Sequence, residues 1–117
     1  MSLAKAVDLV DPWDKTVAIF THGRNMKINP DGTGYSGKWV ISEERLEGIK
    51  KVILYLRNEG GENQLYVGNY IGNHQSDEPR RLVVDFAGLH PVGTTDLNWL
   101  RFAEKGQSPI VIINNEL

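Results

Sequence analysis

The sequence predicts an α+β domain built on a mostly antiparallel curved β-sheet or a small open β-barrel, with two or three short helices. Five or six short apolar runs have the length and composition of strands, whereas only two or three segments have helical spacing. Turn-forming residues separate most of these runs, and strands that follow one another through turns usually pair antiparallel.

The strands are predicted from short apolar runs bounded by turns. Residues 16–20 form the first, and residues 39–41 a second, shorter one. Residues 52–56 are continuously apolar, so we expect a central strand that is covered on both faces. Residues 65–72 follow after a polar turn and form its hairpin partner, in which Gly68 and Gly72 indicate a bulge or a tight bend.

Two further strands complete the prediction. Residues 80–86 form a strand with Leu82, Val84 and Phe86 on one face, and residues 110–113 close the chain.

Three short helices are predicted from spacing and capping residues. Residues 3–10 have apolar side chains at helical spacing up to Asp11-Pro12. Ser42 can cap a brief helix that begins at Glu43. Thr94-Thr95 can cap a helix from residue 96 to about residue 105, where Gly106 ends it.

Length and composition limit the classes of protein. With 117 residues we expect one domain over residues 1–117, in which residues 1–12 form a loosely packed N-terminal segment. The absence of cysteine excludes a disulfide scaffold and thiol catalysis. No apolar run has the roughly 18 residues that span a bilayer, and residues 1–6 have no signal-peptide core. We therefore expect a cytoplasmic protein with no membrane partner.

Catalytic and cofactor motifs are not found. The three histidines have no metal-ligand spacing, and no Gly-Lys-Ser/Thr follows Gly68 and Gly72 to make a phosphate loop. We therefore assign no catalytic residue, no metal and no cofactor, and consider the chain more a binding protein than an enzyme.

The long polar segment of residues 21–38 is the first candidate for function. Such a structureless stretch is uncommon in a small domain unless it has a role. Residues 15–38 hold four basic residues against one acidic residue, although the whole chain has a net charge of −2.

Six residues are the candidate binding site. Basic side chains contact phosphates, asparagine binds base edges and aromatic rings stack on bases, so this segment suggests nucleic acid as a partner. The alternative is a solvated loop with Trp39 in the core. The candidate binding residues are Arg24, Asn25, Lys27, Tyr35, Trp39 and Asp85.

The order of elements resembles the PUA-like group, which includes the EVE and ASCH domains. The similar segments, about half of the chain, are residues 37–42, 43–46, 52–56, 65–71 and 81–86. This resemblance implies a small pseudo-barrel that binds RNA or modified bases in a pocket between the barrel and its loops.

A second resemblance gives an enzymatic alternative. Residues 53–55 (Ile-Leu-Tyr) and 66–68 (Tyr-Val-Gly) resemble the paired tripeptides of GIY-YIG nucleases, which implies that Tyr55 and Tyr66 help to activate water in a metal-dependent reaction. The first tripeptide departs from the motif, and no arginine-bearing helix follows the second.

Three hypotheses therefore stand at the sequence level. The first is a small soluble binding module that recognises nucleic acid or a modified base, and the second is the nuclease. The third is a protein-interaction or self-assembling accessory protein with an exposed apolar patch formed by Trp13, Trp99 or Phe102. The sequence does not define an oligomeric state.

Overall fold

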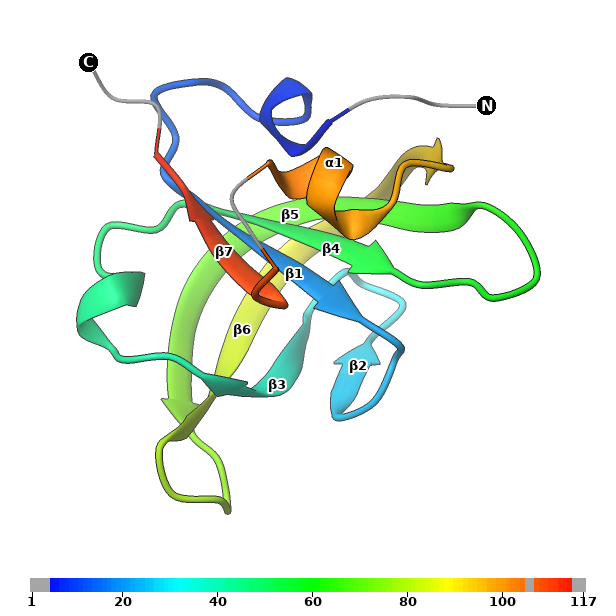
Figure 1. Ribbon diagram of the computed structural model, residues 1–117. Coiled ribbons are helices and arrows are strands. Elements are labelled where there is room, and N and C mark those ends of the chain that lie inside the picture. Colours follow the sequence, from blue (N-terminus) through cyan, green and yellow to red (C-terminus); the bar gives the residue numbers. More distant parts are fainter. Residues whose placement is uncertain (1–4, 105–106, 115–117) are drawn as a thin grey trace.

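The computed structural model describes residues 5–104 and 107–114, which form one curved sheet with short helical segments around it (Figure 1). The elements in chain order are η1 (Ala6–Asp8), β1 (Thr16–Thr21), β2 (Met26–Ile28), β3 (Gly34–Val40), η2 (Glu44–Leu46), β4 (Lys51–Leu56), β5 (Asn63–Gln75), β6 (Arg81–Thr95), α1 (Trp99–Ala103) and β7 (Ile110–Ile113). The segment α1 is an α-helix, whereas η1 and η2 are single 3₁₀ turns. None of the helices in the described residues is long and apolar enough to cross a membrane.

The sheet has the strand order β2-β3-β6-β5-β4-β1-β7. Every pairing within the described residues is antiparallel except that of β1 with β4, which is parallel. The sheet is therefore mixed. Its two end strands, β2 and β7, do not pair with each other within the described residues, so the sheet is open. Of the two predicted alternatives, the mostly antiparallel curved sheet is therefore observed, and a small barrel is not.

The parallel pair of β1 and β4 explains why the strands do not pair in the order in which they follow one another in the chain. Parallel neighbours need a long crossover connection, and here the crossover from β1 to β4 consists of residues 22–50. That connection contains β2 and β3, which pair with each other, and β3 pairs with β6 at the far end of the sheet.

The long hairpin of β5 and β6 gives the sheet its curvature (Figure 1). Its register shifts between Val67 and Asn69 and again between Tyr70 and Gly72. A Cβ atom on Gly68 would lie 2.9 Å from the Cα atom of Leu89, so only glycine fits this close approach of the two strands. The prediction that Gly68 and Gly72 mark bends is confirmed.

The inner, concave face of the sheet carries one hydrophobic core, which we call the inner core. Leu82, Val84 and Phe86 point into it together, as their alternation predicts. Its other buried members are Val17, Ile19, Ile41, Leu46, Ile49, Val52, Leu54, Leu89 and Ile110.

The outer face of β1, β4 and β7 carries a second core, which we call the outer core. Helix α1 and turn η1 cover it, and Ala6 of η1 is fully buried there. The side chains of Val7, Leu9 and Val10 also pack against it. Strand β4 therefore has buried residues on both faces, which confirms that residues 52–56 form a central strand.

The polar segment of residues 21–38 is not a structureless loop. It contains β2 and most of β3, which form a hairpin around the turn of residues 29–33. In that turn, Thr33 donates hydrogen bonds from its backbone and its hydroxyl to the Asp31 carboxylate, which lowers the pKa of Asp31. The residues of this turn are recognisable from the sequence, but β2 and the first part of β3 are short and contain few apolar residues, so the sequence predicts no strand there.

The prediction of the last helix also needs correction. Thr94 and Thr95 belong to the end of β6, and the cap of α1 is Asn98, whose side chain accepts a hydrogen bond from the backbone of Arg101. The helix ends at Ala103, and its C-cap residue Glu104 has a φ of 59°. The predicted stop at residues 105–106 lies outside the described residues.

Candidate functional site

The candidate site begins where β1 and β4 end. Because these strands are parallel and Thr21 lies opposite Leu56, the residues that follow both strands emerge at the same edge of the sheet. The backbone N–H of Arg57 donates to the carbonyl of Thr21 over 2.8 Å. The segments 22–25 and 57–59 therefore lie beside each other (Figure 1).

A tight turn carries the chain from β1 towards β3. The Thr21 hydroxyl accepts a hydrogen bond from the backbone N–H of Gly23, whose φ is +95°. Asn25 has a φ of +55°, which asparagine tolerates better than most residues. Its carbonyl accepts from the N–H of Gly37 over 2.9 Å, so the turn is attached to β3.

A pocket of about 280 Å³ lies between this turn, β3 and the residue before β7. We call it the seam pocket, because β3 and β7 belong to opposite ends of the open sheet. Phe20, Trp39 and Pro109 supply its apolar wall. Its polar lining includes His22, Arg24, Asn25 and Lys38.

Packing holds the aromatic wall in place. The Trp39 indole packs against the inner core, and its Nε1 donates to the buried Ser36 hydroxyl over 3.1 Å. The Phe20 ring stacks on Tyr55 at 5.5 Å and meets His22 edge-on at 5.1 Å. A ligand would therefore meet aromatic surfaces that are already positioned, which lowers the entropy cost of binding.

The cations of the seam pocket differ in their partners. Lys38 forms an ion pair with Asp77 at 2.7 Å and a longer one with Glu78 at 3.5 Å. The hydrogen bond from Lys38 to Asp77 raises the pKa of the lysine, so the ammonium group stays charged. The carboxylate of Asp77 offsets part of that charge toward a ligand. Arg24 has no ion-pair partner among the residues described, so its charge is available to a ligand.

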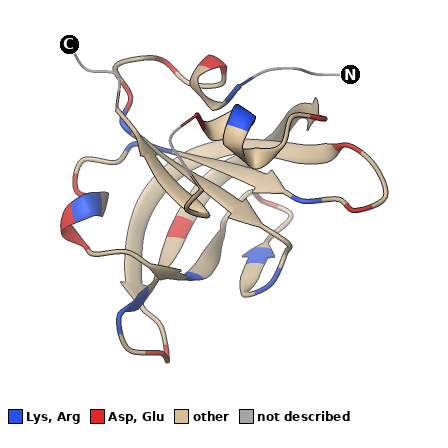
Figure 2. Ribbon diagram, viewed as in Figure 1, with Lys and Arg blue, Asp and Glu red and all other residues tan. Residues whose placement is uncertain are grey.

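A second cavity, of about 540 Å³, adjoins the seam pocket because both are lined by His22 and Arg24. Arg57 and Glu59 complete its lining, and we call it the arginine cavity. Figure 2 shows basic segments both in the β1–β2 connection and at the end of β4. Sequence reasoning missed Arg57 and Glu59, because only the parallel pairing brings their turn to the end of β1.

The six residues predicted from the sequence divide into two groups. Arg24, Asn25 and Trp39 meet in the seam pocket. Lys27, Tyr35 and Asp85 instead form a row of direct cross-strand partners on β2, β3 and β6. This row lies on the outer face, because its neighbours Val84 and Phe86 point into the inner core.

The separation of Tyr35 from Trp39 has a local cause. In a regular strand, residues four apart share a face. Strand β3 has a register shift between Ser36 and Trp39, so Trp39 turns inward while Tyr35 faces outward. Asp85, on the same outer face as Tyr35, lies 2.8 Å from the Nδ1 atom of His74. The six residues therefore do not form a single site.

The tyrosines of the nuclease hypothesis do not share a site either. Tyr55 pairs with Leu65 and Tyr66 with Leu54, so the two rings point to opposite faces of the hairpin. Tyr55 is fully buried, and its hydroxyl donates to the carbonyl of Leu97 over 2.6 Å and accepts from the Asn63 amide over 2.7 Å. Burial raises the pKa of Tyr55. This geometry favours a structural role for Tyr55.

We expect Tyr55→Phe to lower the free energy of unfolding by about 1–3 kcal/mol, because it leaves two buried polar groups without a partner. Urea unfolding would measure this loss, and Tyr66→Phe is the matched control with an expected change within about 0.5 kcal/mol.

The raised pKa of Tyr55 in the folded state means that this tyrosine ionises first in the unfolded chain, so stability declines as the pH rises above the ordinary value of 10.0. That part of the alkaline decline should be absent in Tyr55→Phe. Equal stability of the two variants would contradict the structural role.

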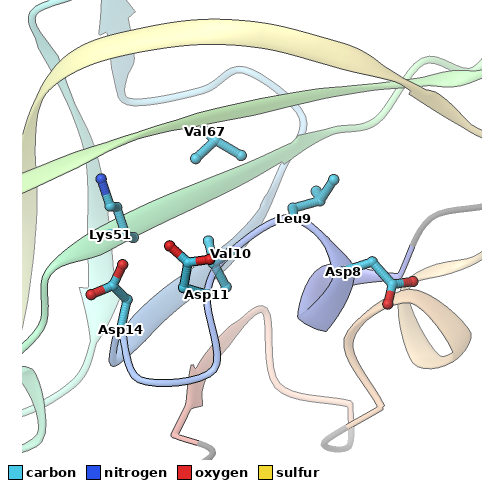
Figure 3. A pocket seen from close by; sticks show the side chains of 7 residues that line it. All are labelled: Asp8, Leu9, Val10, Asp11, Asp14, Lys51 and Val67. Atoms are coloured by element: carbon cyan, nitrogen blue, oxygen red, sulfur yellow. The ribbon is translucent and has the colours of Figure 1, made fainter.

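An acidic pocket of about 260 Å³ lies between the N-terminal segment and strands β4 and β5 (Figure 3). Asp11 and Asp14 lie near Lys51, whereas the carboxylate of Asp8 points away from them. Asp8 accepts a hydrogen bond from the backbone of Lys5, and Lys51 donates to Asn69. Within the described part of the chain, no group of three histidine, cysteine or acidic side chains is placed to hold a metal.

The apolar patch expected for an accessory protein is largely buried. Trp99 and Phe102 belong to the outer core, where Phe102 is fully buried. Trp13 alone of the three predicted residues is well exposed, at 68%. An exposed surface built from all three side chains is therefore absent.

Comparison with protein-family models, with curated proteins and with solved structures found no match for this chain. The seam pocket and the arginine cavity are therefore interpreted from their own residues and from the strands that position them.

Proposed function

We propose that this protein is a small binding module that recognises nucleic acid by holding one base in the seam pocket. The observation that carries this proposal is the combination of a fixed aromatic wall with a cationic rim. Trp39 and Phe20 offer flat apolar surfaces, while Arg24 beside them has no ion-pair partner among the described residues. A planar anionic ligand fits both features at once.

The chemistry of the pocket suits a base and its phosphate. Every base has a flat face that can stack on an indole, and asparagine can bind base edges through its amide. Asn25 and Arg24 lie on the turn that borders the aromatic wall, so they can contact the edge and the backbone of a stacked base. The volume of about 280 Å³ lies just below the range for ligand pockets, about 300–1,000 Å³, and so suits a ligand no larger than one base.

The resemblance of residues 37–86 to PUA-like domains supports the same proposal. It implies binding of RNA or modified bases in a pocket between the barrel of such domains and its loops. The net charge of −2 predicts that few phosphates are contacted, because a strong basic face would need a larger excess of lysine and arginine.

Oligonucleotide binding tests the proposal. We expect single-stranded or modified-base oligonucleotides to bind at low salt, and Arg24→Ala to weaken binding and to reduce the slope of log affinity against log salt by about one. Lys27→Ala removes an equal charge from the outer face and is the matched control, with a smaller expected effect. Fluorescence anisotropy on a panel of DNA and RNA, with and without modified bases, measures both.

Two results would contradict the proposal. The first is the absence of binding to every member of the panel at low salt. The second is an effect of Lys27→Ala equal to that of Arg24→Ala, which would move the interface to the outer row of Lys27, Tyr35 and Asp85.

A further inference from the structure

The arginine cavity collects positive charge from two connections. Arg24 comes from the segment after β1 and Arg57 from the segment after β4, and the parallel pairing of these strands brings the two segments together. Within the described ranges, neither arginine has an ion-pair partner. Glu59 is the single carboxylate of the cavity, and His22 lies between the cavity and the seam pocket.

This charge balance selects among anions. A phosphodiester carries one negative charge, whereas a phosphomonoester carries about 1.5 to 2 at neutral pH. Two guanidinium groups can each offer paired N–H donors to phosphate oxygens. Arg24, Arg57 and Glu59 together leave the cavity with a net charge of +1. The attraction of that net charge grows with the charge of the anion, so a phosphomonoester is favoured over a phosphodiester.

The position of the cavity fits a phosphate attached to a nucleoside. The two cavities share His22 and Arg24, so these two residues stand between a group bound at Arg57 and the aromatic wall of Phe20 and Trp39. A base in the seam pocket would therefore place its sugar near His22 and its phosphate towards Arg57.

We propose that the arginine cavity is a phosphomonoester subsite, so that the preferred ligand is a nucleotide with a terminal phosphate. This inference rests on the proposed function, because it assumes that the base occupies the seam pocket. The shared chemistry can come from a free mononucleotide or from the phosphorylated end of a strand. Arg57 is the residue that distinguishes this ligand from a nucleoside.

Calorimetric titration of the full chain tests the subsite with matched ligands. The probes are a nucleoside, its 5′- and 3′-monophosphates, and one short oligonucleotide with and without a terminal phosphate. We expect the preferred monophosphate to bind about tenfold to a hundredfold more tightly than the nucleoside, which corresponds to one charge-assisted hydrogen bond. Tight binding of mononucleotides alone identifies a free nucleotide, whereas tight binding of the phosphorylated strand identifies a strand end.

Three variants locate the effect. Arg57→Gln should reduce monophosphate affinity to about that of the nucleoside and leave nucleoside affinity unchanged. Arg101→Gln removes the same charge from α1, away from both cavities, and should change neither affinity. Glu59→Gln should tighten monophosphate binding and leave nucleoside binding unchanged. If the cavity had only a structural role, this substitution would not increase the affinity for the monophosphate alone.

The outcomes separate this inference from the proposed function. If the unphosphorylated oligonucleotide binds and a phosphate adds nothing, or if Arg57→Gln weakens both ligands equally, the subsite is overturned and the base pocket stands. If no oligonucleotide or nucleoside binds, but inorganic phosphate raises the unfolding temperature of the native chain and not of Arg57→Gln, the base pocket is overturned and the anion site stands. If no ligand binds, both are overturned.

Discussion

Replacing Phe86 with alanine should lower the free energy of unfolding by about 3–5 kcal/mol, the largest effect that we expect from a single substitution. Phe86 is fully buried in the inner core, where its ring covers Gly34 of β3. A Cβ atom on Gly34 would lie 2.9 Å from the ring, so the ring packs tightly against the backbone of β3. Because this paired backbone cannot easily move inward, removal of the ring should leave a cavity. Small domains are stable by only about 5–15 kcal/mol, so the loss is a large part of the total.

Urea unfolding followed by circular dichroism measures the effect of Phe86→Ala. Ile71→Ala on β5 is the control, because Ile71 is 62% exposed and its loss should cost less than about 0.5 kcal/mol. If Phe86→Ala does not fold, Phe86→Leu keeps most of the apolar volume and should show an intermediate loss. A Phe86→Ala protein that is as stable as Ile71→Ala would mean that the inner face is not a packed core.

Replacing Trp39 with leucine should weaken oligonucleotide binding by about tenfold to a hundredfold, since stacking of one base on an aromatic ring contributes about 1–3 kcal/mol. Leucine keeps apolar contact with the inner core but has no flat face for a base. Trp39→Phe retains such a face and should keep most of the affinity. Anisotropy titrations of both variants against the same oligonucleotide measure the difference.

Trp13→Leu is the matched control for Trp39, because Trp13 is exposed and does not line the seam pocket. The unfolding temperature of each variant separates a loss of binding from a loss of folding. Binding that is unchanged in a folded Trp39→Leu protein would exclude stacking on this residue and, with it, the proposed position of the base.

Much of the fold could be predicted from local sequence patterns. The run of residues 52–56 is apolar without interruption, and both faces of β4 pack against the two cores. Its hairpin with β5 follows from the polar turn between them. The alternation of Leu82, Val84 and Phe86 correctly assigned one face of β6 to the core. Each of these patterns is formed by residues that are adjacent in the chain, so it can be identified without knowledge of the tertiary structure.

The candidate site could be predicted only in part, because its members come together through pairings that have no local signal. Arg24, Asn25 and Trp39 were named from their chemistry and do share the seam pocket. Tyr35 was expected to act with them, but the register shift after Ser36 places it on the other face. Arg57 had no signal at all, since it lies in an ordinary polar turn after a strand.

The sequence by itself therefore determined the apolar strands β1, β4 and β7 and which faces of β4 and β6 are buried, because periodicity and apolar runs are properties of adjacent residues. The polar strand β2 and most of β3 have no such local signal. Only the tertiary structure decided that β1 pairs with β4 in parallel, that the sheet stays open between β2 and β7, and that β3 shifts its register. These features depend on contacts between residues far apart in the chain. The same distant contacts bring Arg24 and Arg57 to one cavity and keep Lys27, Tyr35 and Asp85 away from it.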